Sequence, residues 1–145
     1  MPGSFVQENS KQRERLRALV ARLSDPDLAR PTYEGWTVAG VLAHLAFWDC
    51  RVLLLLQKWK KTGVEASPTD INIVNDAMRP LLLSIPHRRA AEIALETAEA
   101  VDREIEKLDL HLIAEIESKL PDFRLNRGRH RQSHIADIES ALPPK

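Results

Sequence analysis

The chain has 145 residues and 43% hydrophobic side chains, which is enough to bury the core of one domain, expected to span residues 1–145. Its 21 basic and 21 acidic residues cancel, so the net charge excludes a strong long-range attraction to nucleic acid or to an anionic membrane. The single cysteine, Cys50, excludes an intrachain disulfide framework. The first residues show no secretory signal pattern, and we expect a soluble, cytoplasmic protein.

Apolar residues recur at helical spacing along almost the whole chain, and no segment alternates long enough to predict a strand, so the expected fold class is all-α. A first helix is predicted from about Gln7 to Arg22. Two prolines and a glycine then break the pattern between residues 24 and 35, which we interpret as a loop. Thr37 suits the N-cap of a second helix, apolar on most sides, that continues to about Lys60.

The second half of the chain predicts further helices. One begins near Ile71 with Thr69 or Asp70 as its cap, and Pro80 should kink it. A long helix follows Pro86, and a short helical turn precedes the last helix. The predicted ranges are about 71–84, 86–108 and 125–142, with the short turn within 108–120. Four longer helices and one short one are what an antiparallel four-helix bundle with an additional short helix requires.

Three histidines are candidate metal ligands. His130 and His134 stand four residues apart on the last predicted helix, where a turn of about 100° per residue places them about 40° apart on one face. A third, His44, lies in the most apolar helix, where its ring nitrogens need partners. A pair at this spacing also arises by chance on a surface, and a buried histidine can bind a carbonyl. Both alternatives stay open from the residues alone.

Two segments resemble the DinB-like superfamily. LSDPDLARPTYEGWTVAGVLAHLAFWD, residues 23–49, is similar to its helix-loop-helix signature, and LNRGRHRQSHIADIESAL, residues 125–142, is similar to its closing helix. The resemblance implies a four-helix bundle, often a homodimer, in which three histidines hold a divalent ion, zinc or nickel. Carried over to this sequence, the ligands are His44, His130 and His134, with iron or manganese as further options for the ion.

Three neutral imidazoles leave coordination positions open on a divalent ion, which is typical of a reactive site rather than a closed structural one. The resemblance includes thiol-dependent transferases and a maleylpyruvate isomerase, so the first hypothesis is activation of a low-molecular-weight thiol for transfer to a small electrophile. The second hypothesis is hydrolysis of a small substrate by metal-bound hydroxide, which needs a general base. Asp49, Asp137 and Glu139 are the candidate bases. Asp49 points about 140° away from His44, which favours a buried ion pair instead.

A third hypothesis is a binding module without catalysis. The sequence carries four arginines around His130, which suit phosphate contacts, but a solvated face or a pocket rim explains them better because only Phe123 supplies an aromatic neighbour. These arginines are Arg124, Arg127, Arg129 and Arg131. We therefore expect a small-molecule substrate and neither nucleic acid nor a membrane as partner.

A few other residues have two interpretations each. Trp36 and Trp48 suit the walls of a cleft beside the ion, or the core. Asn75 and Arg79 stand four apart and suit substrate contacts, or an ordinary surface pair. Cys50 lacks a histidine at helical spacing and is interpreted as a half-buried thiol. An apolar helix face is expected to form the homodimer.

Overall fold

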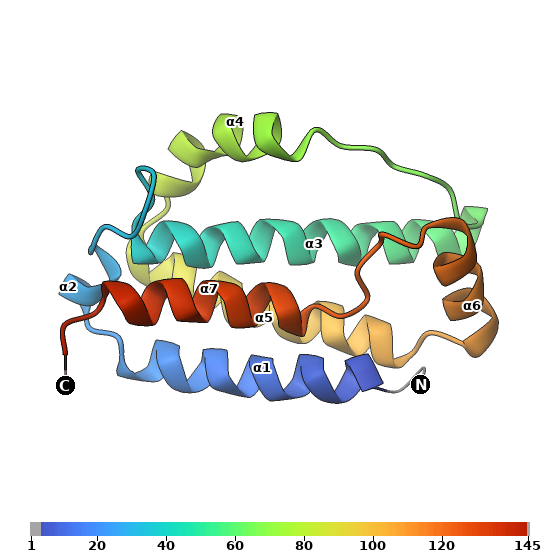
Figure 1. Cartoon of the computed structure of the whole chain (residues 1–145), viewed down its shortest axis with the longest axis horizontal. Helices are drawn as coiled ribbons and strands as arrows, with labels where there is room; N and C mark the ends of the chain where they lie inside the picture. Colours follow the sequence, from blue (N-terminus) through green and yellow to red (C-terminus); the bar gives the residue numbers. More distant parts are fainter. Residues whose placement is uncertain (1–3, 145) are drawn as a thin grey trace.

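The computed structural model describes residues 4–144, and this range is helical apart from loops and one isolated β-bridge between Pro31 and Thr37 (Figure 1). The expected all-α class is confirmed. Seven helices lie in the described range: α1 (Ser4–Arg22), α2 (Asp25–Leu28), α3 (Val38–Thr62), α4 (Ile71–Leu83), α5 (His87–Glu106), α6 (Leu110–Lys119) and α7 (Gly128–Ala141).

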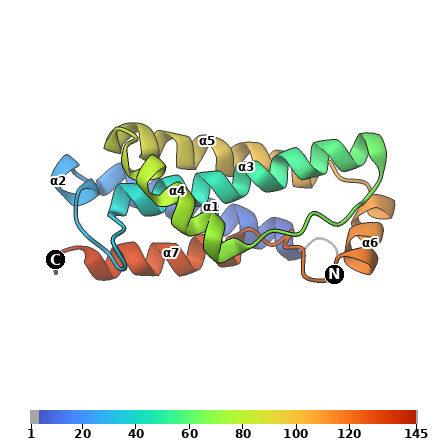
Figure 2. The same ribbon diagram turned by 90° about the horizontal axis from the view of Figure 1, so that it is seen from above.

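Four helices, α1, α3, α5 and α7, lie side by side and make most of the contacts between helices (Figure 1). Helix α3 packs on α5 and α7, and α1 packs on the same two helices from the other side. The view from above shows α4 lying along the outer side of α3, while α6 closes one end of the group (Figure 2). The site described below lies where α3 and α7 meet.

The predicted antiparallel arrangement is wrong for two of the four neighbouring pairs. Lys60 near the end of α3 forms an ion pair with Glu104 near the end of α5, so these two helices run parallel. Helices α1 and α7 are parallel as well, because Arg22 at the end of α1 contacts Glu139 near the end of α7. The physical reason is the long connection of residues 63–70 and α4, which returns the chain to the start of α3 before α5 begins. Such a crossover permits parallel neighbours.

Local capping explains several helix starts. The Thr37 side chain accepts a hydrogen bond from the Gly40 amide, which confirms it as the N-cap of α3, and Asp70 caps α4 in the same way. The segment interpreted as a loop contains α2, which that prediction missed. Its signals are present in the sequence, because Ser24 and Asp27 form a reciprocal capping box.

The last helix begins at Gly128, three residues later than predicted. The buried Asn9 on α1 explains the delay: its side-chain amide donates to the Leu125 carbonyl at 3.0 Å and its side-chain oxygen accepts from the Gly128 amide at 2.8 Å. These two bonds hold the backbone ahead of α7 against α1 rather than in a helical turn. At Gly128 the two helices approach so closely that a Cβ atom would lie 2.8 Å from the Glu8 carbonyl oxygen.

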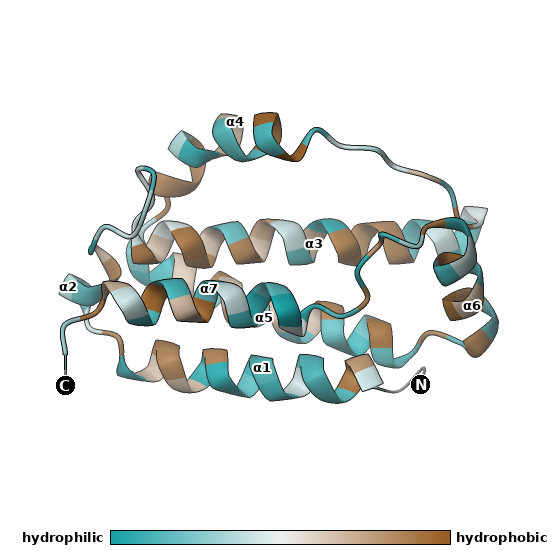
Figure 3. Cartoon of the chain, viewed as in Figure 1, coloured by the Kyte–Doolittle hydropathy of each residue, from teal (hydrophilic) through white to brown (hydrophobic). Residues whose placement is uncertain are grey.

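Hydrophobic residues recur along α3, whereas α1 and α7 carry mixed faces (Figure 3). The apolar side chains bury into two clusters, one around Leu42 and Leu45 and the other around Leu56 and Trp59. By length and composition α3 could cross a membrane, yet 61% of its most apolar window is buried inside the protein. A core helix meets the same criteria, and α3 packs against α2, α4, α5 and α7.

Candidate metal centre

The three histidines singled out in the sequence meet at one point. His44 projects from α3, and His130 and His134 project from successive turns of α7. The ring centroid of His44 lies 5.3 Å from that of His130 and 4.8 Å from that of His134. The centroids of His130 and His134 are 4.7 Å apart. One nitrogen from each ring can be chosen so that all three lie within 4.8 Å of one another. Residues remote in sequence therefore form a single cluster, defined here as the histidine cluster.

All three rings are held in the neutral form. The pKa of His44 is lowered to about 4, first by burial and then by the neighbouring His134 ring. Burial also lowers the pKa of His130 to about 2, with the rings and arginines around it acting in the same direction. For His134 burial lowers the pKa, although the Asp137 carboxylate opposes the shift. Neutral imidazole is the form that donates a lone pair to a metal ion.

The donor set fits a divalent ion. The Nδ1 atoms of His44 and His130 are buried without a hydrogen-bond partner among the described residues, which is costly for a polar group unless a ligand satisfies the ring. His134 differs, since its Nδ1 lies 3.1 Å from Oδ2 of Asp137 and leaves the other nitrogen available. Nitrogens that share a tetrahedral zinc ion stand about 3.3 Å apart, given Zn–N bonds of about 2.0–2.1 Å. The candidate nitrogens of the cluster lie within 4.8 Å of one another, somewhat wider than that spacing.

Two cavities open onto the histidine cluster. One has a volume of about 310 Å³ and is lined by all three histidines together with polar side chains such as Tyr33 and Asp76. The other has a volume of about 410 Å³ and is lined by His44, His130 and the side chain of Trp48. The cluster is thus reachable from two sides rather than enclosed.

The candidate carboxylates divide into separate roles. Asp49 is 2% exposed and forms ion pairs with Arg127 and Arg131, so the buried-ion-pair interpretation is correct. Asp137 contacts His134 and orients its ring. Glu139 contacts Arg15 and Arg22 on the outer face of α1 and does not line either cavity at the cluster. Of the three candidate bases, the structure brings only Asp137 to the histidines.

The arginines around His130 are not all on a solvated face. Arg131 is fully buried and lines neither cavity at the cluster, which corrects the sequence interpretation for this residue. Arg127 is 6% exposed and so is not on a solvated face, but it lines the larger cavity. Arg131 donates to both oxygens of Asp102 at 2.9 Å and to Asp49 at 3.2 Å, so its charge is neutralised inside the bundle. Arg124 and Arg129 are exposed and line the larger cavity, as a pocket rim would.

Both tryptophans lie beside the histidines, and Trp36 is also part of the buried core, so both of its interpretations hold. Trp36 packs its ring edge-on at 5.5 Å from His44, and Trp48 lines the larger cavity. Asn75 accepts a hydrogen bond from the Trp48 indole at 3.0 Å and lines both cavities. Arg79 stacks over Trp36 at 5.6 Å and lines the smaller cavity. A simple surface pair is therefore wrong for Asn75 and Arg79, whereas Cys50 is half-buried as expected and lines none of these spaces.

Sequence reasoning missed Tyr33, whose hydroxyl lies 3.4 Å from Nδ1 of His134. The turn that presents it depends on Glu34 and Gly35, both at positive φ. The bridge between Pro31 and Thr37 closes this turn. A turn signal directly before Trp36 was visible in the sequence, yet it gave no direction for the tyrosine side chain.

The buried rings predict a pH dependence of stability for the protein with its metal removed by a chelator. An unfolded histidine has a pKa near 6.5, so between about pH 6.5 and pH 4 the unfolded chain binds more protons than the folded one. The free energy of unfolding should fall as the pH is lowered through this window, by about 1.4 kcal/mol for each unit of pKa difference. Urea denaturation across the window measures the slope. Substitution His44→Gln should make the slope shallower, because one of the three buried rings is removed, and an unchanged slope would count against the buried, neutral His44.

An all-helical chain with a three-histidine cluster open to two cavities defines the class of candidate metal-binding helical proteins. Residues 10–134 match the family described as the mycothiol maleylpyruvate isomerase N-terminal domain, and the chain belongs to this family, a DinB-like superfamily domain. The match covers His44, His130 and His134. Comparison with curated proteins and with solved structures gave no match.

Proposed function

We propose that His44, His130 and His134 bind a divalent metal ion, zinc or nickel in the first place and iron or manganese otherwise. We further propose that the site activates a low-molecular-weight thiol for transfer to a small electrophile. The observation that carries the proposal is the convergence of three neutral imidazoles within 4.8 Å, on two helices of a chain that belongs to a family described by a thiol-dependent isomerase. The packing of α1, α3, α5 and α7 against one another supports the four-helix bundle that the DinB-like resemblance implies.

The residues of the site would have different roles in such a reaction. A bound divalent ion would supply positive charge that lowers the pKa of a coordinated thiol or water. His44, His130 and His134 would hold it without neutralising that charge. Asp137 fixes the ring of His134 through the 3.1 Å contact, and the Tyr33 hydroxyl stands at the same ring, where it can donate a hydrogen bond to a reacting group.

The two cavities favour group transfer over hydrolysis. A transfer needs two co-substrates at one point, and two spaces of about 310 and 410 Å³ meet at His44 and His130. Asn75 lines both spaces and accepts the hydrogen bond from Trp48, so its side chain can keep two ligands apart. Hydrolysis of a small substrate is the alternative, and Glu34 and Asp76 in the smaller cavity are the carboxylates that would serve it. A non-catalytic metal-binding or ligand-binding module has the same ligands and no turnover.

A thiol-consumption assay tests the proposal. Protein loaded with zinc or nickel should accelerate the loss of a small thiol in the presence of an electrophile panel, and the protein treated with a chelator should not. His134→Ala should abolish the acceleration, whereas His87→Ala, a histidine outside the cluster, should retain it. Metal-dependent loss of an ester or amide substrate without thiol consumption would select the hydrolase. If neither reaction depends on the metal, the enzymatic proposal is rejected.

We also propose that the protein is a cytoplasmic homodimer with a small-molecule substrate, without nucleic acid or membrane as partner. Support for a dimer comes from large apolar side chains left exposed on two adjacent helices. On α3 these side chains are Phe47 and Leu54, and on α4 they are Ile71, Ile73 and Leu81. Sedimentation equilibrium measures the mass of the protein in solution directly.

A further inference from the structure

Cavities follow one another along α3, from the histidine cluster toward the opposite end of the helix. The space of about 410 Å³ at His44 shares Trp48 and Arg124 with a neighbouring space of about 250 Å³. That space shares Arg51 and Phe123 with a third one of about 330 Å³, which reaches Trp59. Adjacent spaces with common walls form one groove, defined here as the α3 groove. Only its first part belongs to the site already described.

The α3 groove is long relative to a small thiol or a small electrophile. Its walls include His44 at one end and Trp59 at the other, fifteen residues apart on the same helix. A rise of 1.5 Å per residue places them about 22 Å apart along the helix axis. A ligand that used the whole groove would therefore be elongated.

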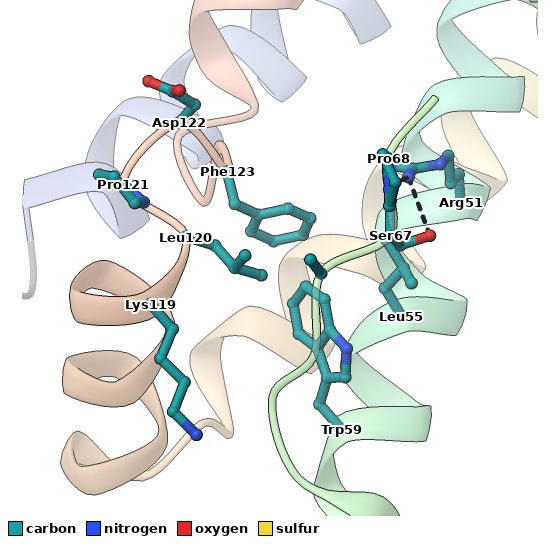
Figure 4. A pocket seen from close by; sticks show the side chains of 11 residues that line it. Arg51, Leu55, Trp59, Ser67, Pro68, Lys119, Leu120, Pro121, Asp122 and Phe123 are labelled. Carbon is teal, nitrogen blue, oxygen red and sulfur yellow. Dashed lines mark hydrogen bonds between the residues drawn. The ribbon is translucent and has the colours of Figure 1, made fainter. Parts of the chain in front are cut away.

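The end of the groove remote from the histidines is apolar. Leu120 and Phe123 point toward Trp59 across the cavity, and the Phe123 ring meets the Trp59 ring edge-on at 4.8 Å (Figure 4). The Asp122 side chain points away from this end (Figure 4). Aromatic and aliphatic walls of this kind suit an alkyl or aryl tail.

The segment between α3 and α4 covers the groove, and a specific set of contacts holds it there. Arg51 donates from one Nη atom to the Ser67 carbonyl at 2.6 Å, to the Ser67 hydroxyl at 3.3 Å and to the Thr69 hydroxyl at 3.1 Å. The same guanidinium lies 5.9 Å from the centre of the Trp48 ring. Because Arg51 makes these hydrogen bonds to other residues of the protein, it forms part of the wall of the α3 groove.

The end of the groove nearest the histidines carries positive charge that the protein does not neutralise. Arg127 is paired with Asp49, but Arg124 and Arg129 have no ion pair among residues 4–144. Both exposed arginines line the 410 Å³ space beside His130. Two unpaired guanidinium groups next to the apolar part of the α3 groove are complementary to an anionic group attached to an apolar tail.

We propose that the α3 groove binds an elongated anionic amphiphile, with its carboxylate at Arg124 and Arg129 beside the histidine cluster and its apolar tail along α3 to Trp59 and Phe123. The inference names a substrate class for the proposed function and rests on that function only in placing the reacting part of the molecule at the histidines. Binding itself depends on the groove and the arginines.

Dodecanoate, used below its micelle concentration, is the probe, and isothermal titration calorimetry of the full chain is the measurement. Ala66 is exposed and lines the apolar end, so Ala66→Trp should fill the tail site and weaken dodecanoate binding at least tenfold. The matched control is Ala29→Trp, at an exposed alanine outside the groove, which should bind like the wild type. The double substitution Arg124→Ala with Arg129→Ala should also weaken binding at least tenfold, while Arg89→Ala on α5 should not.

Three outcomes would overturn the assignment: equal affinity in Ala66→Trp and the wild type, acetate binding as tightly as dodecanoate, or dodecyltrimethylammonium binding as tightly as dodecanoate. Metal content is determined on the same samples, so the two proposals can fail separately. Dodecanoate binding without stoichiometric metal would reject the proposed function alone. Metal binding and thiol consumption without dodecanoate binding would reject the groove assignment alone.

Discussion

Replacing Arg131 with alanine should lower the free energy of unfolding by about 3–5 kcal/mol, because removal of one partner leaves buried charge uncompensated. Arg131 is fully buried and donates to Asp49 and Asp102 and to the Asn9 and Ala98 carbonyls, at 2.9 to 3.3 Å. A domain of this size has about 5–15 kcal/mol in total, so the variant should lose a large fraction of its stability. Urea denaturation followed by circular dichroism measures the loss.

A matched surface substitution separates burial from charge. Arg89 on α5 also contacts two carboxylates, Glu92 and Glu96, but it is about half exposed, so its substitution by alanine should change the free energy of unfolding far less than Arg131→Ala does. Arg131→Lys keeps the charge and loses the two-pronged contact with Asp102, so its cost should fall between the two alanine variants. Losses of equal size in Arg131→Ala and Arg89→Ala would refute the view that the buried network holds α7 in place.

Replacing Asp137 with alanine should weaken zinc or nickel binding about 10–100-fold while leaving the stoichiometry intact, because the carboxylate orients a ligand rather than being one. Its Oδ2 lies 3.1 Å from Nδ1 of His134, which fixes the ring with the other nitrogen toward the cluster. Competition with a chromophoric chelator measures the affinity.

Glu139→Ala is the control for this variant, since Glu139 lies on the same helix but contacts Arg15 and Arg22 on α1 instead of a histidine. Its metal affinity should equal that of the wild type. Asp137→Asn retains an oxygen that can accept from Nδ1 and should recover part of the affinity. An Asp137→Ala protein with unchanged affinity would show that Tyr33 or burial alone orients His134.

Sequence periodicity predicted the helical class and most helix positions because apolar residues recur at helical spacing along α3 and α5. It missed α2, a helix of four residues that is too short to show a period, although its capping residues Ser24 and Asp27 were visible. The relative direction of the helices could not be predicted from the sequence either. Whether α5 runs with or against α3 depends on where the crossover of residues 63–70 leads, which no local pattern records.

The histidines were predictable because spacing restricted two of them to one face and the resemblance supplied the third. Arg131 shows the opposite case. Its partners Asp49 and Asp102 come from α3 and α5, so only the assembled bundle distinguishes a buried bidentate arginine from a surface one. Tyr33 and the α3 groove were inaccessible for the same reason, since both depend on side chains that distant segments bring together.

Elemental analysis of protein purified without an affinity-tag metal column shows whether three imidazoles from α3 and α7 hold one metal ion. We expect one equivalent of a divalent metal per chain in the wild type and none in His130→Ala, with circular dichroism showing that the variant is still helical. Absence of metal from a folded wild type that also fails to take up zinc or nickel on titration would contradict this expectation. So would a full equivalent retained by the folded His130→Ala protein.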